Sequence, residues 1–208
     1  MDGWITVREE AKAEYTDRKS VFIAETKPVS SEEEAIEFLE QIKKRTADAR
    51  HHVYAYILND RGITRFSDDG EPHGTAGMPV LSLLRRENLS DVVLVVTRYF
   101  GGILLGTGGL VRAYTESARM ALEKAGRKKV ERVARCRIVC PYSEYSMLES
   151  LLSAFSDAVR KESADFGESV EMVFLVSESK CSAVLAEWTE ATAGKCPAEV
   201  IEHLFSSL

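Results

Sequence analysis

The chain has 208 residues, of which 45% are hydrophobic and 29% charged, an ordinary composition for a globular protein that excludes a disordered one. No apolar run is long enough to span a membrane, and the N-terminal stretch lacks the basic start and apolar core of a secretion signal, so we expect a cytoplasmic protein. Residues 1–132 are balanced in charge, whereas residues 133–208 hold 6 basic and 12 acidic residues. This acidic C-terminal part disfavours extended contact with nucleic acid.

The four cysteines all lie in the last third of the chain and show no CxxC spacing. They are Cys136, Cys140, Cys181 and Cys196. The pattern favours reduced, mostly buried thiols over a zinc site or disulfides, and we expect no cofactor.

The residue pattern changes at Gly126, where a long helical pattern ends in a glycine that is followed by the basic run Arg127-Lys128-Lys129. We place the domain boundary there. One domain is expected over residues 1–128 and a second over residues 133–208.

The first domain begins with strand and helix patterns. Residues 4–29 predict two strands around a polar turn. Ser31 with Glu34 makes a capping box for the helix that follows. Its apolar face is expected to hold Ile36, Leu39 and Ile42.

Two further strand patterns form a predicted hairpin. HHVYAYIL (51–58) and ITRF (63–66) are rich in β-branched and aromatic residues, and they flank the turn Asn59-Asp60-Arg61-Gly62. Successive residues of a strand face opposite sides, so at most one of His51 and His52 shares a surface with His73. The other is expected to be buried and hydrogen-bonded.

The stretch FSDDGEPHGTAGMPVL (66–81) crowds acids and a histidine around glycines. Its spacing does not match a calcium-binding loop of the EF-hand type. Metal ligation by Asp68, Asp69 or His73, with help from His51 or His52, is one interpretation. The alternative is that the two aspartates accept backbone N–H bonds in a turn, and that Thr75 caps a helix through MPVLSLLRR.

The stretch TRYFGGILLGTGGLVRAY (97–114) overlaps the end of DVVLVVTRYF (91–100). The unbroken apolar run of the latter predicts a strand covered on both faces. Phosphate-loop and dinucleotide motifs fail here, because Thr107-Gly108 replaces Lys-Ser/Thr and Val111 stands where a glycine is required. A glycine loop that opens a helix is still suited to an anion, with Arg98 adding a bidentate contact. The alternative is that the glycines only permit tight turns and close packing. Tyr99 and Phe100 are candidates for stacking on a partner.

A helix is predicted from Gly109 to Lys124, with charge pairs on its outer side between Arg112 and Glu116 and between Arg119 and Glu123. Its buried side is expected to hold Leu110, Tyr114, Ala118, Ala121 and Leu122.

After the boundary, the patterns follow the order strand, helix, strand, strand, helix. With a final strand this is the βαββαβ order of a ferredoxin-like domain. The last segment, residues 197–208, is ambiguous, because its apolar residues also fit a helix. They are Val200, Ile201, Leu204 and Phe205.

The motifs RFSDDGEPHGTAGMPVL and VVTRYFGGILLGTGGLVRAYTESA, together with ARHHVYAY at 49–56, resemble the IMPACT family, including its YigZ-like bacterial members. The resemblance covers residues 5 to about 126, and it implies an α+β protein. The first domain would have the ribosomal protein S5 domain 2-like fold with a four-stranded sheet. The smaller second domain would be ferredoxin-like, similar to the fifth domain of the translocation elongation factor.

Both likenesses imply a role connected with translation. Eukaryotic relatives regulate the starvation-activated initiation-factor kinase by competing for its coactivator, but they carry a different extra domain. For a bacterial member, the resemblance implies binding of nucleic acid or the ribosome, and it transfers no catalytic residue. The family's motif positions are Asp68, Asp69, Gly70, Glu71, Pro72, Gly74, Thr75, Gly77, Pro79, Arg98, Tyr99, Gly101, Gly102, Gly106, Gly109, Arg112 and Tyr114.

Two functional hypotheses follow. The first is a binding or regulatory protein without catalysis, which recognises a ribosome, an RNA or a translation-regulatory protein through residues 67–77 and 98–112, with no membrane contact. The second is a metal-dependent hydrolase that uses Asp68, Asp69 and His73. The candidate binding residues are Asp68, Asp69, Glu71, His73, Thr75, Arg98, Tyr99, Gly101, Gly102, Gly106, Gly108, Gly109 and Arg112.

Overall fold

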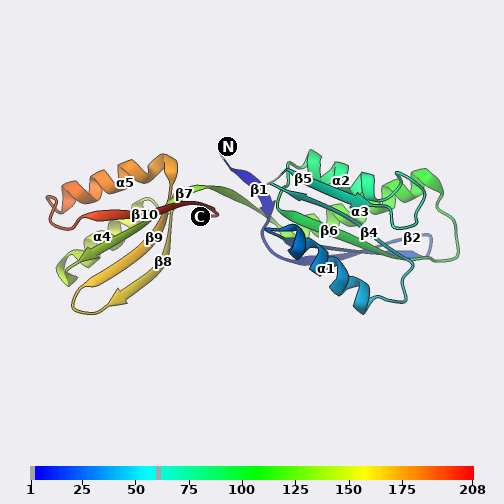
Figure 1. Cartoon of the computed structure of the whole chain (residues 1–208), viewed down its shortest axis with the longest axis horizontal. Coiled ribbons are helices and arrows are strands. Elements are labelled where there is room, and N and C mark those ends of the chain that lie inside the picture. The colour runs from blue at the N-terminus through cyan, green and yellow to red at the C-terminus, as the bar shows by residue number, and fades with distance from the viewer. Residues whose placement is uncertain (1–2, 60–61) are drawn as a thin grey trace. The chain divides into compact units, whose positions relative to one another are not determined.

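The computed structural model describes residues 3–59 and 62–208, which form two compact units (Figure 1). The first unit spans Trp4–Lys128, and the second contains Lys129–Leu208 together with Gly3. None of the helices in the described ranges is long and apolar enough to cross a membrane.

The first unit is built on one antiparallel sheet of five strands in the order β2-β3-β6-β4-β5. The strands are β2 (Ala11–Asp17), β3 (Ser20–Pro28), β4 (His51–Leu58), β5 (Ile63–Ser67) and β6 (Val92–Tyr99). A short additional strand, β1 (Trp4–Val7), forms a parallel bridge from Ile5 to Leu89. The predicted hairpin of β4 and β5 is confirmed, while residues 60 and 61 of its turn lie outside the described ranges.

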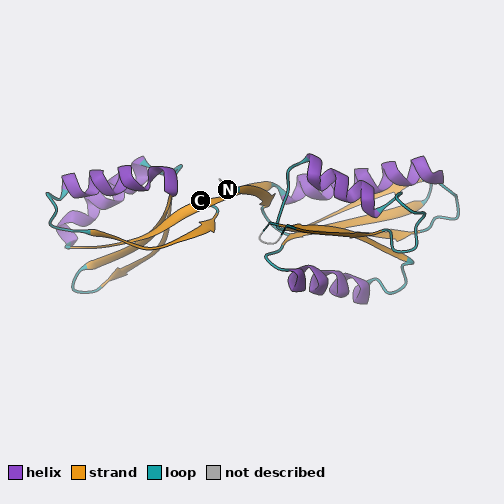
Figure 2. Cartoon of the chain, turned by 45° about the horizontal axis from the view of Figure 1, so that its top comes forward, coloured by secondary structure: helices purple, strands orange, loops and turns teal. Residues whose placement is uncertain are grey.

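Helices cover both faces of this sheet (Figure 2). The helix α1 (Glu32–Arg45) packs on one face, where its Phe38 and Ile42 join a core with Val93 and Val95 of β6. The helices α2 (Gly77–Arg86) and α3 (Gly106–Ala125) pack on the other face, against Val92, Leu94 and Val96. The central strand β6 is therefore buried on both sides, as its apolar run predicts.

Several expectations for the first unit are wrong. The sheet has five strands instead of four, because the tight turn Arg18-Lys19 folds β2 against β3 as an additional edge strand. Ile36 is 48% exposed, because the buried stripe of α1 runs through Ala35, Phe38, Leu39 and Ile42.

The helix α3 begins at Gly106, three residues before the predicted start, because Gly106–Gly108 already belong to the helix. All five apolar residues predicted for its buried side are buried. The predicted pair of Arg112 with Glu116 is wrong, because Glu116 binds Arg119, whose Nη2 lies 2.6 Å from its Oε1. Arg119 also reaches Glu123, as predicted.

The second unit follows the predicted order of strands and helices. Its elements are β7 (Arg127–Cys140), α4 (Tyr142–Ala154), β8 (Val159–Phe166), β9 (Val170–Ser177), α5 (Glu178–Ala191) and β10 (Ala198–Ser206). The strands pair antiparallel in the order β10-β7-β9-β8. Both helices lie on one face of this sheet (Figure 2), where they enclose the core around Phe174 and Trp188.

The last segment is a strand, which resolves the ambiguity of residues 197–208. Its register against β7 shifts between Val200 and Glu202. This irregularity interrupts the alternation of apolar and polar residues, which explains why the sequence also fitted a helix.

The four cysteines are free and buried, as predicted. Burial, together with the neighbouring Cys181, raises the pKa of Cys136 to about 12. A thiol with such a pKa stays protonated at neutral pH and is a poor nucleophile. We therefore assign Cys136 to the core of the second unit.

Candidate functional site

The side chain of Asp68 caps the start of α2, although Asp68 lies eight and nine residues before the capped N–H groups of Ala76 and Gly77. Its Oδ1 accepts hydrogen bonds from the N–H groups of Ala76 (3.1 Å) and Gly77 (2.8 Å), and its Oδ2 accepts one from Gly74 (2.8 Å). Burial raises the pKa of the Asp68 carboxyl, but these backbone N–H groups together lower it further, and the pKa lies below its usual value. The carboxylate thus satisfies N–H groups that the helix leaves unpaired and meets the positive end of the helix dipole.

Thr75 does not cap α2, contrary to the expectation. Its hydroxyl donates to the carbonyl oxygen of Pro72 at 2.6 Å, and the residue before the helix, Ala76, has no side-chain oxygen to offer. The hydroxyl stabilises the turn 72–75, while the carboxylate of Asp68 supplies the cap. The expectation that Asp68 accepts backbone N–H bonds is confirmed.

Glu71 and Arg98 form an ion pair inside the first unit, with side chains only 3% and 6% exposed. The Nη1 atom of Arg98 lies 2.6 Å from Glu71 Oε1, and the Tyr114 hydroxyl donates to the same oxygen at 2.8 Å. Burial and the negative charge of Glu71 raise the pKa of Tyr114, so its hydroxyl keeps the proton that it donates. The guanidinium group of Arg98 also lies 5.4 Å from the ring centre of Phe22 and 5.5 Å from that of Phe100.

This pair changes the expected roles of two candidate residues. Arg98 was expected to contact an external anion, and Glu71 was a candidate binding residue. Instead they contact each other, because β6 carries Arg98 into the interior beneath the loop of Glu71. The pair joins the two glycine-rich stretches, 66–81 and 97–114, across 27 residues of sequence.

The histidines near Asp69 occupy different environments. His52 is buried, with its Nε2 atom 2.8 Å from the Thr46 hydroxyl, as predicted for one member of the pair. His51 Nδ1 lies 2.7 Å from the carbonyl oxygen of Asp69, whose side chain accepts the N–H of His52 at 2.6 Å. His73 is fully exposed, and its Nδ1 atom lies 3.7 Å from Asp68 Oδ2.

These contacts bear on the metal hypothesis. Asp68 and Asp69 each use carboxylate oxygens to accept backbone N–H bonds, which fixes the loop. Within residues 3–59 and 62–208, no group of three or more His, Cys, Asp or Glu side chains is arranged to hold a metal ion. The loop around Asp68 therefore has the geometry of a structural turn.

The loop from Phe100 to Leu105 connects β6 to α3 and rests on the turn between β2 and β3. The N–H of Gly101 donates to the Ser20 hydroxyl at 3.1 Å, and Arg18 Nη1 donates to the carbonyl oxygen of Leu104 at 3.5 Å. Gly101 is required here by close approach, because a Cβ atom would lie 2.0 Å from the backbone carbon of Lys19. The glycine thus serves packing, as the structural alternative predicts.

We expect Gly101→Ala to lower the free energy of unfolding by about 1–3 kcal/mol, because the added methyl group must displace backbone atoms of Lys19. Gly108→Ala is the matched control, because that glycine is helical and its nearest neighbour is a flexible end of Arg112 at 3.7 Å. The control should be neutral or stabilising by up to about 1 kcal/mol. Urea-induced unfolding measures both, and equal stabilities of the two variants would contradict the packing role of Gly101.

The remaining candidates lie around the start of α3. Gly102 and Gly106 have positive φ values of 82° and 71°, and Gly109 fits closely against Leu105. The Tyr99 hydroxyl donates to Asp48 Oδ1 at 3.1 Å, and burial together with Asp48 raises its pKa. Arg112 is exposed on the first turns of α3.

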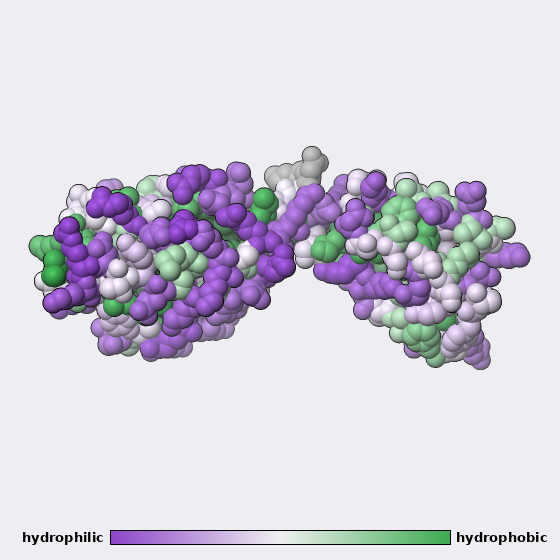
Figure 3. Space-filling model, turned by 180° about the vertical axis from the view of Figure 1, so that it is seen from behind, coloured by the Kyte–Doolittle hydropathy of each residue, from purple (hydrophilic) through white to green (hydrophobic). Residues whose placement is uncertain are grey.

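The exposed side chains of the loop 100–105 are apolar. Leu104 is 80% exposed, Phe100 46% and Ile103 43%, all in the loop before α3. Figure 3 shows strongly hydrophobic surface at the tip of the first unit, the end at which Figure 1 places this loop. A groove of about 300 Å³ lies between α2 and α3, lined on its apolar side by Met78 and Val111.

Comparisons with known proteins agree with the two-part organisation. The model of the Impact N-terminal domain matches residues 18–122, and that of a domain of unknown function (DUF1949) matches residues 138–195. The chain belongs to the IMPACT family. Both glycine-rich stretches lie within the first match, so the resemblance recognised from their motifs is confirmed.

Relatives in this family match most of the chain. The IMPACT family member YvyE of Bacillus subtilis (strain 168) is 40% identical over 199 residues, which cover 94% of this chain and 89% of YvyE. YigZ of Escherichia coli (strain K12) is 37% identical over 161 residues, which cover 73% of this chain and 76% of YigZ. A solved structure, described as the crystal structure of an hypothetical protein, has a TM-score of 0.62 and 30% identity, and covers 97% of this chain and 98% of that one.

The sequence analysis missed the residues that give this IMPACT family chain its exposed apolar loop. Ile103 and Leu104 stand between glycines, outside any strand or helix. The signal was present, because an apolar run in a loop has no core to enter and is therefore expected at the surface. Two of the charged candidates, Arg98 and Glu71, are internal instead.

Proposed function

We propose that this IMPACT family chain is a cytoplasmic, non-catalytic binding protein linked to translation, which recognises a protein surface through residues 67–77 and 98–112. The observation that carries the proposal is the exposure to solvent of three large apolar side chains in one loop, those of Phe100, Ile103 and Leu104. A cluster of exposed apolar side chains at a loop tip is typical of a site that a partner covers.

The loop is held in one shape before any partner arrives. The Arg18 side chain donates to the carbonyl oxygen of Leu104, and the Ser20 hydroxyl accepts the N–H of Gly101, so both ends of the loop are supported. The internal pair of Glu71 and Arg98 lies directly beneath, with the Arg98 guanidinium next to the Phe100 ring. A preorganised loop loses little conformational entropy on binding, which favours recognition.

The charges beside residues 67–77 and 98–112 favour a protein partner over RNA. Arg98 is internal, and the exposed Arg112 shares its groove with Asp17 and Glu116. In the second unit, Arg135 is paired with Glu162 and with Glu202. Phosphate binding needs cations that are not already neutralised, so apolar contact is the better-supported mode.

The link to translation rests on likeness of fold. The order of elements from β7 to β10 and the strand order β10-β7-β9-β8 support a ferredoxin-like second domain, similar to the fifth domain of the translocation elongation factor. The likeness of the first unit to ribosomal protein S5 domain 2 is implied by the family motifs in residues 66–81 and 97–114. We therefore propose the ribosome as the first partner to test.

We expect the full chain to sediment with purified ribosomes through a sucrose cushion, and Leu104→Asp to weaken this binding by about tenfold or more. An aspartate at this position would have to be desolvated in an apolar interface. Ile36→Asp is the matched control, because Ile36 is 48% exposed on α1, which packs on the opposite face of the sheet from α3.

Three results would overturn this proposal. One is that the wild-type chain does not sediment with ribosomes. Another is that Leu104→Asp and Ile36→Asp bind equally well. The third is that protein-free ribosomal RNA binds as tightly as the ribosome with a steep dependence on salt, which would indicate contacts with phosphate groups.

A further inference from the structure

The edge strand β2 is the longer of the two edge strands of the first sheet, neither of which has a bulge, because β5 pairs with β4 over only five residues. It pairs with β3 through all seven of its residues in an unbroken register, and it contains no proline. In the second unit, both edge strands carry a register shift, β8 at Lys161/Ser163 and β10 at Val200/Glu202. Bulges protect an edge from additional strands, and β2 has none.

The turn that joins β2 to β3 fixes which backbone groups face outward. Arg18 and Lys19 have φ values of 45° and 68°, which are typical of the two-residue turn that closes a hairpin. The flanking residues Asp17 and Ser20 are therefore a hydrogen-bonded pair, and the pairs alternate from there along the register. By this alternation, the N–H and C=O groups of Lys12, Glu14 and Thr16 point to the free edge.

A row of α3 side chains runs beside this edge. Arg112, Glu116, Met120 and Lys124 recur every four residues, so they lie along one side of the helix. Together with β2 they line two grooves, one of about 440 Å³ with Ala13 and one of about 470 Å³ with Tyr15.

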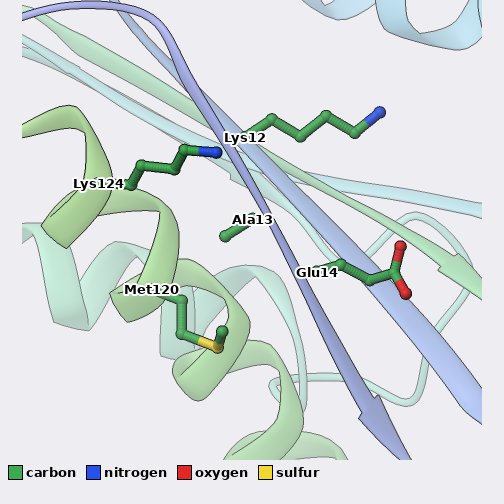
Figure 4. A pocket seen from close by; sticks show the side chains of 5 residues that line it. All are labelled: Lys12, Ala13, Glu14, Met120 and Lys124. Carbon is green, nitrogen blue, oxygen red and sulfur yellow. The ribbon is translucent and has the colours of Figure 1, made fainter.

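Figure 4 shows the first of these grooves. Ala13 points from β2 toward Met120, and Lys124 reaches from α3 toward the strand, whereas Lys12 and Glu14 point away to the other side. Alternate side chains of a strand added to β2 would therefore enter the space in front of Met120 and Lys124.

We propose that an extended, acidic segment of a partner protein adds to the free edge of β2, with an acidic side chain against Lys124 and an apolar one against Met120. Among the described residues, Lys124 forms no ion pair, whereas Glu116 is already paired with Arg119. The main chain of the segment binds the outward groups of β2, and its alternate side chains fill the two grooves. This inference goes beyond the proposed function, because it uses β2 and not the loop 100–105.

The test uses the full chain and a phage-displayed library of random decapeptides as the probe. Selected peptides are expected to alternate in polarity and to contain Asp or Glu. A synthetic copy of a selected peptide then serves as the ligand. The Glu14→Pro variant of the chain should bind it about tenfold or more weakly than the wild type, because proline removes an outward N–H from the edge of β2. Lys124→Glu, which leaves the backbone unchanged, should weaken binding similarly, and Lys44→Glu on α1 should not.

Amide exchange measured by NMR gives a second readout. The N–H groups of Lys12, Glu14 and Thr16 should exchange fast in the free chain and slowly with the peptide bound, while those of Ala13 and Tyr15 are slow in both. The Leu104→Asp variant should still bind the peptide, and the Glu14→Pro variant should still sediment with ribosomes. The proposed peptide site on β2 and the proposed ribosome contact of the loop 100–105 can therefore fail or succeed separately.

Three outcomes would overturn the inference. One is that the library yields no binder, or only binders without acidic residues. Another is that bound peptides leave the three outward amides unprotected. The third is that these amides are already protected in the free chain and sedimentation shows a dimer, which would assign the edge to a second copy of the chain.

Discussion

Replacing Arg98 with alanine is expected to lower the free energy of unfolding by about 3–5 kcal/mol. The carboxylate of Glu71, whose side chain is 3% exposed, would lose Arg98 and keep the hydroxyl of Tyr114 at 2.8 Å and the more distant Nε2 atom of His51 at 3.9 Å. Leaving one buried charge without its counter-ion is among the most destabilising single changes, because the charge cannot be rehydrated. Urea-induced unfolding followed by circular dichroism measures the loss.

Two further variants separate the buried pair from ordinary surface charge. Arg119→Ala removes an exposed arginine that also binds glutamates, and we expect a far smaller change, because water screens that site. The double variant Arg98→Met with Glu71→Met removes both buried charges, and we expect it to recover part of the stability lost in Arg98→Ala. An Arg98→Ala variant as stable as Arg119→Ala would show that the internal pair does not hold the two loops together.

Local patterns predicted the helices and strands well, because each depends on neighbours in sequence. The cap of α1 is an example. Ser31 accepts the N–H of Glu34 at 3.2 Å, as the capping box predicts, although the Glu34 carboxylate turns back to Ser30 and not to Ser31. The buried face of α3 and the doubly covered strand β6 likewise follow from the spacing of apolar residues.

The functional residues were harder to predict, because their partners are distant in sequence. Arg98 lies near the end of the buried strand β6 and would be judged by its charge to be exposed, but Glu71, 27 residues earlier, stabilises it inside. The sequence contains no signal for this pairing other than the presence of two opposite charges in neighbouring motifs. With this pair internal, the exposed side chains of the loop before α3 are those of Phe100, Ile103 and Leu104.

The start of α2 was predicted incorrectly for a related reason. Thr75 stands where a local cap is expected, and a rule based on adjacent residues selects it. The chain instead folds back through a turn at Asp69 and Gly70, with φ values of 42° and 83°, which brings Asp68 to the helix end. A carboxylate six to nine residues before the N–H groups that it binds lies outside any local rule.

Asp68→Ala is expected to lower the free energy of unfolding by about 2–4 kcal/mol near neutral pH, because three N–H groups at the start of α2 lose their charged acceptor. The pKa of this carboxyl is lower in the folded chain than its usual value. Its contribution is therefore fully present above the pKa of the unfolded chain, about 4, and it is lost as the pH falls toward the lower folded pKa.

The stability difference between wild type and Asp68→Ala should accordingly shrink as urea unfolding is repeated from pH 7 down to pH 3. Asp165→Ala is the control, because that aspartate is exposed on β8, and its difference from wild type should be small at every pH. His73 is a further cause of the low pKa of Asp68, because its ring lies 3.7 Å from the carboxylate. Since this ring is fully exposed, His73→Ala should change the free energy of unfolding little. If the Asp68→Ala difference were constant across this pH range, the carboxylate charge would not contribute to the cap, and shape alone would hold the helix end.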